Sequence, residues 1–269
     1  MKKLALIYDF DKTLSPKDMQ EFHLTSRLGH KTPAEFWSRC AKASKKDNMD
    51  GILSYMMLMK KEGINLTHKD LNDEGKYIEL FKGVDTWFKR INTYGKKHGI
   101  KVEHYIISSG VKEIIEGTKI AKEFKKIYAC SFAYDENNEI TWPARVVNYT
   151  TKTQYLFRIN KGVLDEMNDF DLNRSTPEDE KYIPFSNMVY FGDGLTDVPS
   201  MKVVLGNGGY TVAIYDTAKE KEALALELKH DKRATFAFAA DFSSGSKVEQ
   251  AIKGIIDSIE ARNKLEKLK

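Results

Sequence analysis

Residues 4–11 read LALIYDFD, and this stretch decides the fold. Five consecutive apolar residues end at Asp9, which is the pattern of a strand buried on both faces of a parallel sheet. Similar apolar runs at 105–107, 188–191 and 210–215 also stop at small or acidic residues. Because ligands in open α/β sheets bind outside the carboxyl ends of the strands, we expect these strand ends to share one crevice.

The segment between the first two strand ends, 14–103, is too long for a single crossover connection. Its apolar residues recur at helical spacing, and a helix at about 84–97 is expected to return the chain to the sheet. The sequence therefore predicts an α/β fold with a Rossmann-like parallel sheet core. The core is assigned to 1–15 and 85–269, and a mainly helical cap domain, 16–84, is inserted after the first strand.

The rest of the chain alternates short strands and helices. Turn residues between two apolar stretches predict a small hairpin, and helical periodicity predicts a helix whose N-cap is Thr150 or Thr151. The Met-rich stretch in the cap is expected to be core. The predicted segments are the hairpin strands 127–134 and 139–142, the helix 151–167, a polar loop 168–187, the closing helix 248–259, and the cap core 56–59.

The composition is that of a water-soluble globular protein. Of 269 residues, 41% are hydrophobic and 30% charged, and the formal net charge is +4. Solvated helix faces explain the paired lysines better than a nucleic-acid surface does. Asp9 cuts the first apolar run, which is too short for a signal peptide, and no run approaches the roughly 18 apolar residues of a membrane span. We expect a cytoplasmic protein that binds neither nucleic acid nor membranes, and the oligomeric state is left open.

The two cysteines, Cys40 and Cys130, lie far apart in the sequence and form no CxxC motif. Neither a disulfide framework nor a zinc site is indicated by this spacing. Both side chains are expected to be buried free thiols.

Two carboxylates at the end of the first strand indicate metal-assisted chemistry. Asp9 and Asp11 stand two residues apart directly after the buried strand, so their negative charges need compensation. Mg²⁺ binds one or two carboxylates together with phosphate oxygens and water. A carboxylate held near such an ion can attack phosphorus, and a second carboxyl group can protonate the leaving oxygen and then activate water. The alternative is that both residues cap the turn that follows.

A second acidic strand end follows the apolar run 188–191. The sequence there is GDGLTD, residues 192–197, and it offers Asp193 and Asp197 between glycines that let the backbone approach a ligand. An ordinary Gly-Asp turn is the alternative. Two acidic strand ends on one parallel sheet nevertheless favour a shared site.

Two further elements are candidates for holding a phosphate group. Ser108, Ser109 and Gly110 offer hydroxyl and backbone N–H donors where a strand opens into a helix. Lys152, at the start of the helix after the hairpin, could neutralise phosphate charge. Lys161 is the competing lysine, but we expect it to lie away from the strand ends.

The order of these elements resembles that of the haloacid dehalogenase superfamily. DFDKT at 9–13, the apolar run into Ser108, then Lys152, then GDGLTD at 192–197 are similar to its four motifs. The resemblance covers the core. It implies a phosphoric monoester hydrolase, that is, a Mg²⁺-dependent phosphatase acting on a small phosphorylated metabolite.

The resemblance also implies a role for each motif residue. Asp9 would form an aspartyl-phosphate, while Asp11 would serve as general acid and then base and bind Mg²⁺ through its backbone carbonyl. Asp193 would be the remaining carboxylate ligand, and Asp197 would support the metal shell. The phosphoryl group would be held by Ser108 and Lys152, and the other predicted phosphate or substrate contacts are Thr13, Ser109 and Gly110.

Asp11 narrows the reaction that the resemblance implies. Dehalogenases and phosphonatases of this superfamily lack an acid two residues after the nucleophile, whereas phosphatases and phosphomutases have one. The chain looks most similar to the phosphoserine phosphatase branch, in which Asp18 would contact a substrate amine; a helix N-cap is the alternative for Asp18. The helical insert and the polar stretch after Lys152 depart from that branch, so the substrate is left open. A phosphotransferase or phosphomutase, or a non-catalytic phosphate or metal-binding module, is the alternative function.

Overall fold

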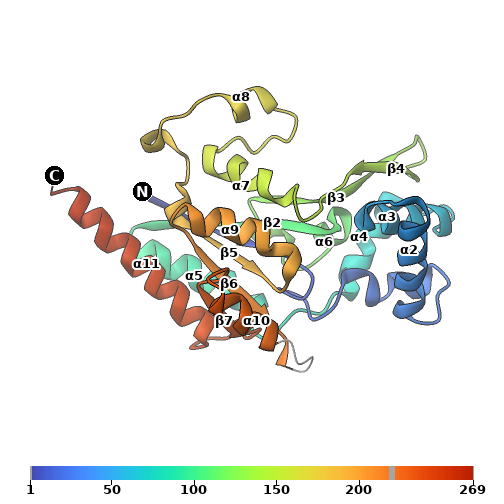
Figure 1. Ribbon diagram of the computed structural model, residues 1–269, viewed down its shortest axis with the longest axis horizontal. Coiled ribbons are helices and arrows are strands. Elements are labelled where there is room, and N and C mark those ends of the chain that lie inside the picture. Colours follow the sequence, from blue (N-terminus) through green and yellow to red (C-terminus); the bar gives the residue numbers. More distant parts are fainter. Residues whose placement is uncertain (1, 218–221, 269) are drawn as a thin grey trace.

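A mostly parallel sheet forms the centre of the structure, a computed structural model that describes residues 2–217 and 222–268 (Figure 1). Within these residues seven strands lie in the order β4-β3-β2-β1-β5-β6-β7. Neighbouring strands are parallel except β4, which runs antiparallel to β3. The strands are β1 (Lys2–Tyr8), β2 (Ile100–Val111), β3 (Lys126–Tyr134), β4 (Ile140–Arg145), β5 (Met188–Gly192), β6 (Tyr210–Tyr215) and β7 (Phe236–Ala239). The predicted α/β class with a parallel sheet core is confirmed.

The first strand occupies the middle of this sheet. All five residues of the apolar run that ends at Tyr8 are fully buried, because β2 and β5 flank β1 and helices cover both faces. Tyr8 pairs with Ile106 of β2 and with Phe191 of β5. The strands β2, β3 and β4 lie on one side of β1, and β5, β6 and β7 lie on the other. The order of the strands therefore reverses its direction at β1. Ligand sites of open α/β sheets lie at such reversal points.

Helices lie on both faces of the sheet (Figure 1). The helices α5 (Val84–Lys97) and α11 (Lys247–Glu266) pack together on one face, and α7 (Lys152–Lys161) and α9 (Val198–Gly206) on the other. The predicted returning helix and closing helix are confirmed as α5 and α11, and α11 extends beyond the predicted span. The other core helices are α6 (Lys112–Glu116), α8 (Asp169–Asn173) and α10 (Glu222–His230). Met1, 218–221 and Lys269 belong to the predicted core segments but lie outside the described residues.

The long insert after β1 is helical, as predicted. It contains α1 (Leu24–Arg27), α2 (Pro33–Asp47), α3 (Gly51–Glu62) and α4 (His68–Glu74), with the short 3-10 helices η1 (Met19–Glu21) and η2 (Gly75–Tyr77). The side chains of Thr32, Asp50 and Thr67 accept backbone N–H bonds at the first turns of α2, α3 and α4, which fixes where these helices begin. Met56 and Met59 are fully buried, so the Met-rich stretch is core as expected. The exact limits of the cap domain stay a prediction.

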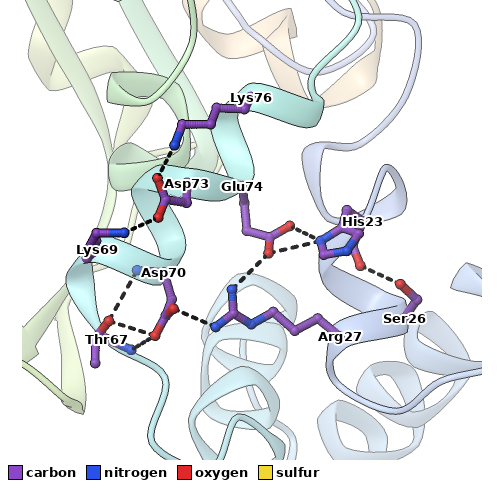
Figure 2. A network of polar contacts seen from close by, with 9 residues as sticks. All are labelled: His23, Ser26, Arg27, Thr67, Lys69, Asp70, Asp73, Glu74 and Lys76. Atoms are coloured by element: carbon purple, nitrogen blue, oxygen red, sulfur yellow. Dashed lines mark hydrogen bonds and ion pairs between the residues drawn. The ribbon is translucent and has the colours of Figure 1, made fainter.

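An ion-pair network joins the beginning of the insert to its end (Figure 2). Arg27 of α1 pairs with Asp70 at 2.6 Å and with Glu74 at 3.3 Å, and His23 Nδ1 lies 2.9 Å from the Glu74 carboxylate. Thr67 and Asp70 also form a reciprocal capping box at the start of α4. Because α4 packs on α6 of the core, the network holds the segment around η1 in a fixed place relative to the sheet.

Two sequence predictions about local structure need correction. The helix predicted at 151–167 is α7 and ends at Lys161, because Gly162 adopts a left-handed conformation (φ 74°) that terminates it. Its N-cap residue is Thr151, but the Thr151 side chain makes no capping hydrogen bond. The run 105–107 was expected to end a strand, whereas β2 continues to Val111. Its pairing with β3 shifts register between Ile107 and Val111, so the intervening residues lie in an irregular stretch of strand.

Several expectations from composition can be compared with the structure. Cys40 and Cys130 are free and buried, as predicted. Across the part of the chain that the structure describes, no helix combines the length and the hydropathy needed to cross a bilayer. The hairpin is confirmed as β3 and β4, and its turn lies beside the insert: the Ile140 N–H donates to the Leu66 carbonyl at 2.9 Å.

A buried chain of polar groups supports the strand that ends at Asp9. Trp87 Nε1 donates to the Tyr8 hydroxyl at 2.8 Å, and the Tyr8 hydroxyl lies 3.0 Å from His104 Nδ1. The other ring nitrogen of His104 lies 3.1 Å from Asn92 Oδ1. A neutral His104 with its proton on Nε2 satisfies every contact in this chain. Burial lowers the pKa of His104 to about 3.

Stability should therefore fall as the pH drops below the ordinary histidine pKa. The folded protein keeps His104 neutral down to a pKa of about 3, whereas the unfolded chain binds the proton at about 6.5. The stabilisation is present above about pH 6.5 and is lost toward acid, at up to about 1.4 kcal/mol per pH unit. When the pH is lowered from about 7 to about 5.5, the free energy of unfolding measured in urea should fall by roughly 1 kcal/mol because of this residue. A His104→Gln variant, although less stable, should lack that component; the same slope in both proteins would contradict the assignment.

Candidate active site

A pocket opens at the carboxyl ends of β1 and β5, where the strand order reverses. Its volume is about 360 Å³, within the roughly 300–1,000 Å³ of small-molecule sites. The Asp9 N–H donates to the Phe191 carbonyl at 2.9 Å, which continues the β1–β5 ladder and fixes the Asp9 backbone at the pocket floor. The predicted site residues on the pocket wall are Asp9, Asp11, Asp18, Ser108, Ser109, Lys152 and Asp193. The two acidic strand ends thus meet, as expected.

Three carboxylates form a cluster with the spacing of a metal site. One carboxylate oxygen each from Asp9, Asp193 and Asp197 lies within 4.8 Å of the other two. Two oxygens that share Mg²⁺ through bonds of about 2.1 Å lie at most about 4.2 Å apart, so a small side-chain adjustment suffices. Hard oxygen ligands suit Mg²⁺. The residues present therefore fit a divalent cation held between Asp9 and Asp193.

Both carboxylate oxygens of Asp197 already accept hydrogen bonds from other protein groups, and these bonds hold the carboxylate cluster in place. It is fully buried, and its Oδ1 accepts from Lys152 at 2.8 Å and from the Tyr190 hydroxyl at 2.8 Å. Its Oδ2 accepts the Asp193 N–H at 3.2 Å, which positions the loop that carries Asp193. Gly192 makes this possible, since a Cβ there would lie only 2.4 Å from the Asp197 carboxyl carbon.

Lys152 is the buried cation of the site. It is 1% exposed, and its ammonium group lies 3.2 Å from Asp9 Oδ2 as well as 2.8 Å from Asp197 Oδ1. Burial works to lower the pKa of Lys152, but the charges of Asp197 and Asp9 outweigh it and hold the pKa well above the ordinary value. The competing Lys161 donates instead to the Leu172 and Arg174 carbonyls, at 2.5 and 2.6 Å, away from the strand ends.

The two acids of the first motif are both strongly perturbed. Burial raises the pKa of Asp9 to about 7, against the opposing effect of Lys152 and together with the charges of Asp197 and Asp193. Burial and the charges of Asp18 and Asp9 raise the pKa of Asp11 well above its usual range. Asp11 is thus poised to carry a proton, as a general acid must. Further positive charge placed beside Asp9 would lower this pKa and favour the ionised carboxylate.

Neither acid accepts the N–H groups that close the following turn, which was the alternative; Asp9 Oδ1 accepts the N–H of the adjacent Phe10 at 2.8 Å. The Phe10 carbonyl closes that turn by accepting the N–H groups of Thr13, Leu14 and Ser15 at 2.9 to 3.3 Å. Asp11 Oδ1 instead accepts the Met19 N–H at 2.9 Å, eight residues along the chain. The carboxylates at the strand end are therefore left facing the pocket.

Some of the predicted phosphate-binding residues line the pocket, and others lie behind its wall. Ser108 and Ser109 line the pocket, in the irregular stretch of β2. Ser108 Oγ accepts the Gly110 N–H at 3.0 Å, and Gly110 itself does not line the pocket. Thr13 is fully buried and likewise absent from the wall, so the structure gives its hydroxyl no path to a phosphate group.

Asp18 lines the pocket and is paired with a lysine. The Lys12 ammonium group donates to the Asp18 carboxylate. Asp18 is the N-cap residue of η1, as the alternative had it, but its side chain makes no capping hydrogen bond. Sequence reasoning gave Lys12 no role.

Other wall residues were also missed. Most come from the insert, where one sequence shows no signal that separates inward-facing from packed side chains. Leu195 and Thr196 stand inside the GDGLTD motif, whose spacing could have indicated them. The missed wall residues are Lys12, Gln20, Trp37, Gly51, Ile52, Tyr55, Gly194, Leu195 and Thr196.

Comparisons with known sequences agree with this geometry. The family model described as haloacid dehalogenase-like hydrolase matches residues 6–202, which include both acidic strand ends and Lys152. An uncharacterized protein of Borreliella burgdorferi is 26% identical over 276 residues, spanning 91% of this chain and 93% of that protein.

Solved structures show the same fold. A substrate-bound phosphoserine phosphatase has a TM-score of 0.57 at 16% identity, over 88% of this chain and 93% of that chain. A HAD family hydrolase from Salmonella enterica subsp. enterica serovar Typhi has a TM-score of 0.58 at 16% identity. That match covers 87% of this chain but 66% of the Salmonella chain, so this chain spans just under two thirds of that relative's length. At such identities the likeness establishes the fold and nothing finer.

Proposed function

Because the chain belongs to the haloacid dehalogenase-like hydrolase family, we propose that it is a Mg²⁺-dependent phosphatase. It hydrolyses a small-molecule phosphate monoester through an aspartyl-phosphate on Asp9. The observation that carries this proposal is the convergence of Asp9, Asp11 and Asp193 on one pocket wall. Asp11 supports a phosphate ester as substrate, because the second acid supplies the proton that an alcohol leaving group requires.

The first half of the reaction transfers the phosphoryl group to the protein. An Asp9 carboxylate oxygen attacks phosphorus, and the bond between phosphorus and the ester oxygen breaks. Asp11, whose pKa is raised well above its usual range, donates its proton to the departing oxygen, so that a neutral alcohol leaves. Ser108, on the pocket wall beside the two acids, is placed to donate to a phosphoryl oxygen.

The second half returns the protein to its starting state. Asp11, now a carboxylate, takes a proton from water, and the resulting oxygen attacks phosphorus as the bond to Asp9 breaks. Phosphate leaves and Asp11 is again protonated, so protons balance over the cycle. Lys152, whose ammonium group contacts Asp9 and Asp197, offsets negative charge on the transferring group.

Mg²⁺, held by Asp9 and Asp193 with the Asp11 carbonyl, would supply positive charge against the phosphoryl oxygens. Asp197 would act on this site through the Asp193 N–H that it accepts. The insert at 16–84 supplies much of the opposite wall, so we propose that it acts as a cap that selects the substrate. The partner is a small phosphorylated metabolite.

Purified protein should hydrolyse p-nitrophenyl phosphate only when Mg²⁺ is present. EDTA should abolish phosphate release and added Mg²⁺ should restore it, because the Asp9 and Asp193 charges cannot otherwise admit a phosphate dianion. Asp193→Asn should need about tenfold or more Mg²⁺ for half-maximal rate, as loss of a carboxylate ligand weakens metal binding. The measurement is initial rate against free Mg²⁺ concentration.

A matched control is Asp231→Asn, an exposed acid after α10 and outside the pocket wall. It should keep the wild-type Mg²⁺ dependence. Metal-independent turnover by clean protein, or an unchanged Mg²⁺ requirement in Asp193→Asn, would overturn the proposal.

A further inference from the structure

The two lysines on the pocket wall are paired with carboxylates before any substrate enters. Lys12 donates to Asp18, and Lys152 contacts Asp9 and Asp197. Among residues 2–217 and 222–268, no arginine lines the pocket. A substrate carboxylate would therefore meet no uncommitted cation, and a substrate ammonium group would have to displace Lys12 from Asp18.

Two aromatic residues of the insert, Trp37 and Tyr55, line the pocket. Trp37 Nε1 donates to the Glu21 carboxylate at 2.9 Å, and the Tyr55 hydroxyl donates to the Ser109 carbonyl at 2.6 Å. The two rings meet edge to face, with centroids 6.0 Å apart. Because their polar atoms are already bonded, these side chains offer a ligand chiefly apolar contact.

Gln20 adds a polar group with no protein partner. It is among the residues that line the pocket and is 2% exposed, and its Oε1 is itself buried and accepts no hydrogen bond among the described residues. An unpaired buried amide oxygen is destabilising, so a partner from a ligand accounts for its retention. The position of Gln20 is fixed on both sides. The adjacent Met19 N–H is bonded to Asp11, and the His23 to Glu74 contact anchors the chain after η1 (Figure 2).

From these contacts we propose the substrate class. The substrate is a phosphate monoester of an uncharged alcohol that carries a planar ring and a hydroxyl or N–H group. The ring packs on Trp37 and Tyr55, and the hydroxyl or N–H group donates to Gln20 Oε1 after a rotation of the amide turns this buried oxygen toward the pocket. This inference rests on the proposed phosphatase function. It sets the chain apart from an enzyme for a zwitterionic ester, whose two charges the paired Lys12 and Asp18 do not accommodate without separating.

Four esters separate the contributions of ring, donor and charge. Phenyl phosphate has a ring without a donor, glycerol phosphate has donors without a ring, a nucleoside 5′-monophosphate has both, and phosphoserine is zwitterionic. With Mg²⁺, kcat/KM should be highest for the nucleoside monophosphate and at least ~10-fold lower for phosphoserine. Phosphate release from each ester gives the ranking.

Two variants then test the contacts. Each should keep its activity toward one ester, which shows that the variant is folded. Gln20→Leu should lower kcat/KM about 10-fold for glycerol phosphate and the nucleoside monophosphate and leave phenyl phosphate within ~2-fold of wild type. Trp37→Leu should lower it about 10-fold for the two ring-bearing esters and spare glycerol phosphate. Gln154→Leu, at an exposed position on α7 outside the pocket, should change none of them.

Three results would overturn the inference. The first is phosphoserine turnover equal to that of the nucleoside monophosphate. The second is an equal loss for all esters in Gln20→Leu. The third is hydrolysis of none of the four esters, which would remove the proposed function as well, whereas Mg²⁺-dependent hydrolysis with a different ranking would leave that function standing.

Discussion

Replacing Asp9 with asparagine should lower kcat for phosphate ester hydrolysis by at least ~1,000-fold while the protein stays folded. An amide is a poor nucleophile toward phosphorus, and no other group takes the place of Asp9 at the end of β1. The change also removes one negative charge from the cluster with Asp193 and Asp197, so folding should not suffer. Steady-state p-nitrophenyl phosphate hydrolysis measures the loss.

The intermediate can be followed separately from the rate. After rapid acid quenching during turnover, intact mass spectrometry should find a phosphoryl adduct on wild-type protein, and peptide mapping should place it on Asp9. Asp9→Asn should show no adduct. Wild-type rates in this variant, or a phosphoryl group on another residue, would contradict the nucleophile assignment. Asp231→Asn again serves as the control, because it makes the same Asp-to-Asn substitution outside the pocket.

The position of Asp9 was predictable because it depends on a local pattern. A continuous apolar run must be covered on both faces, and the structure buries all of 4–8 between β2 and β5. The same argument applied to 188–191 placed Asp193 at the neighbouring strand end. The order of motifs then indicated the family, which the family model confirms. Periodicity also gave the helical character of the insert.

The pocket wall opposite the strand ends was not predictable in this way. The pairing of Lys12 with Asp18 depends on a turn in which Lys12 adopts a left-handed conformation (φ 59°). This conformation is uncommon for residues other than glycine, so the sequence does not predict it at a lysine. Gln20 reads as an ordinary surface glutamine until the packing of η1 buries it. Such contacts arise from tertiary packing, which spacing along one chain does not encode.

The local geometry around the predicted phosphate-binding residues was missed for a related reason. The pattern of apolar residues ended at Ile107, so the strand was expected to end there, but Val111 pairs again with Cys130 of β3. The irregular stretch between them carries Ser108 and Ser109 to the pocket wall. Only pairing with a neighbouring strand reveals that irregularity.

Replacing Lys152 with methionine should lower the free energy of unfolding by about 3–5 kcal/mol when no metal is present. The change leaves Asp9 and Asp197 buried without the cation that lies 3.2 and 2.8 Å from them. The loss should shrink as Mg²⁺ is added, because a cation bound by the folded state stabilises it and replaces part of the missing charge. Urea unfolding at about pH 8, in EDTA and then across a Mg²⁺ series, measures both effects.

The pH dependence of this variant follows from Asp9. Burial already raises the pKa of Asp9 to about 7 with Lys152 present, and loss of that cation should raise it further. The folded variant then holds a proton that the unfolded chain, with a pKa of about 3.9, releases. Its stability relative to wild type should therefore improve as the pH falls from about 8 toward about 6, since the folded state binds more protons there.

The matched control lies on the same helix. Lys161→Met removes an ammonium group that donates to two backbone carbonyls of the polar stretch after α7. The loss should be about 1 kcal/mol, without Mg²⁺ or pH sensitivity of the kind expected at Lys152, and with catalysis intact. Lys152→Met should in addition lose activity that Mg²⁺ does not restore, because the lysine offsets charge on the transferring phosphoryl group. Equal effects of the two substitutions would show that Lys152 acts only through packing, and they would remove it from the catalytic machinery.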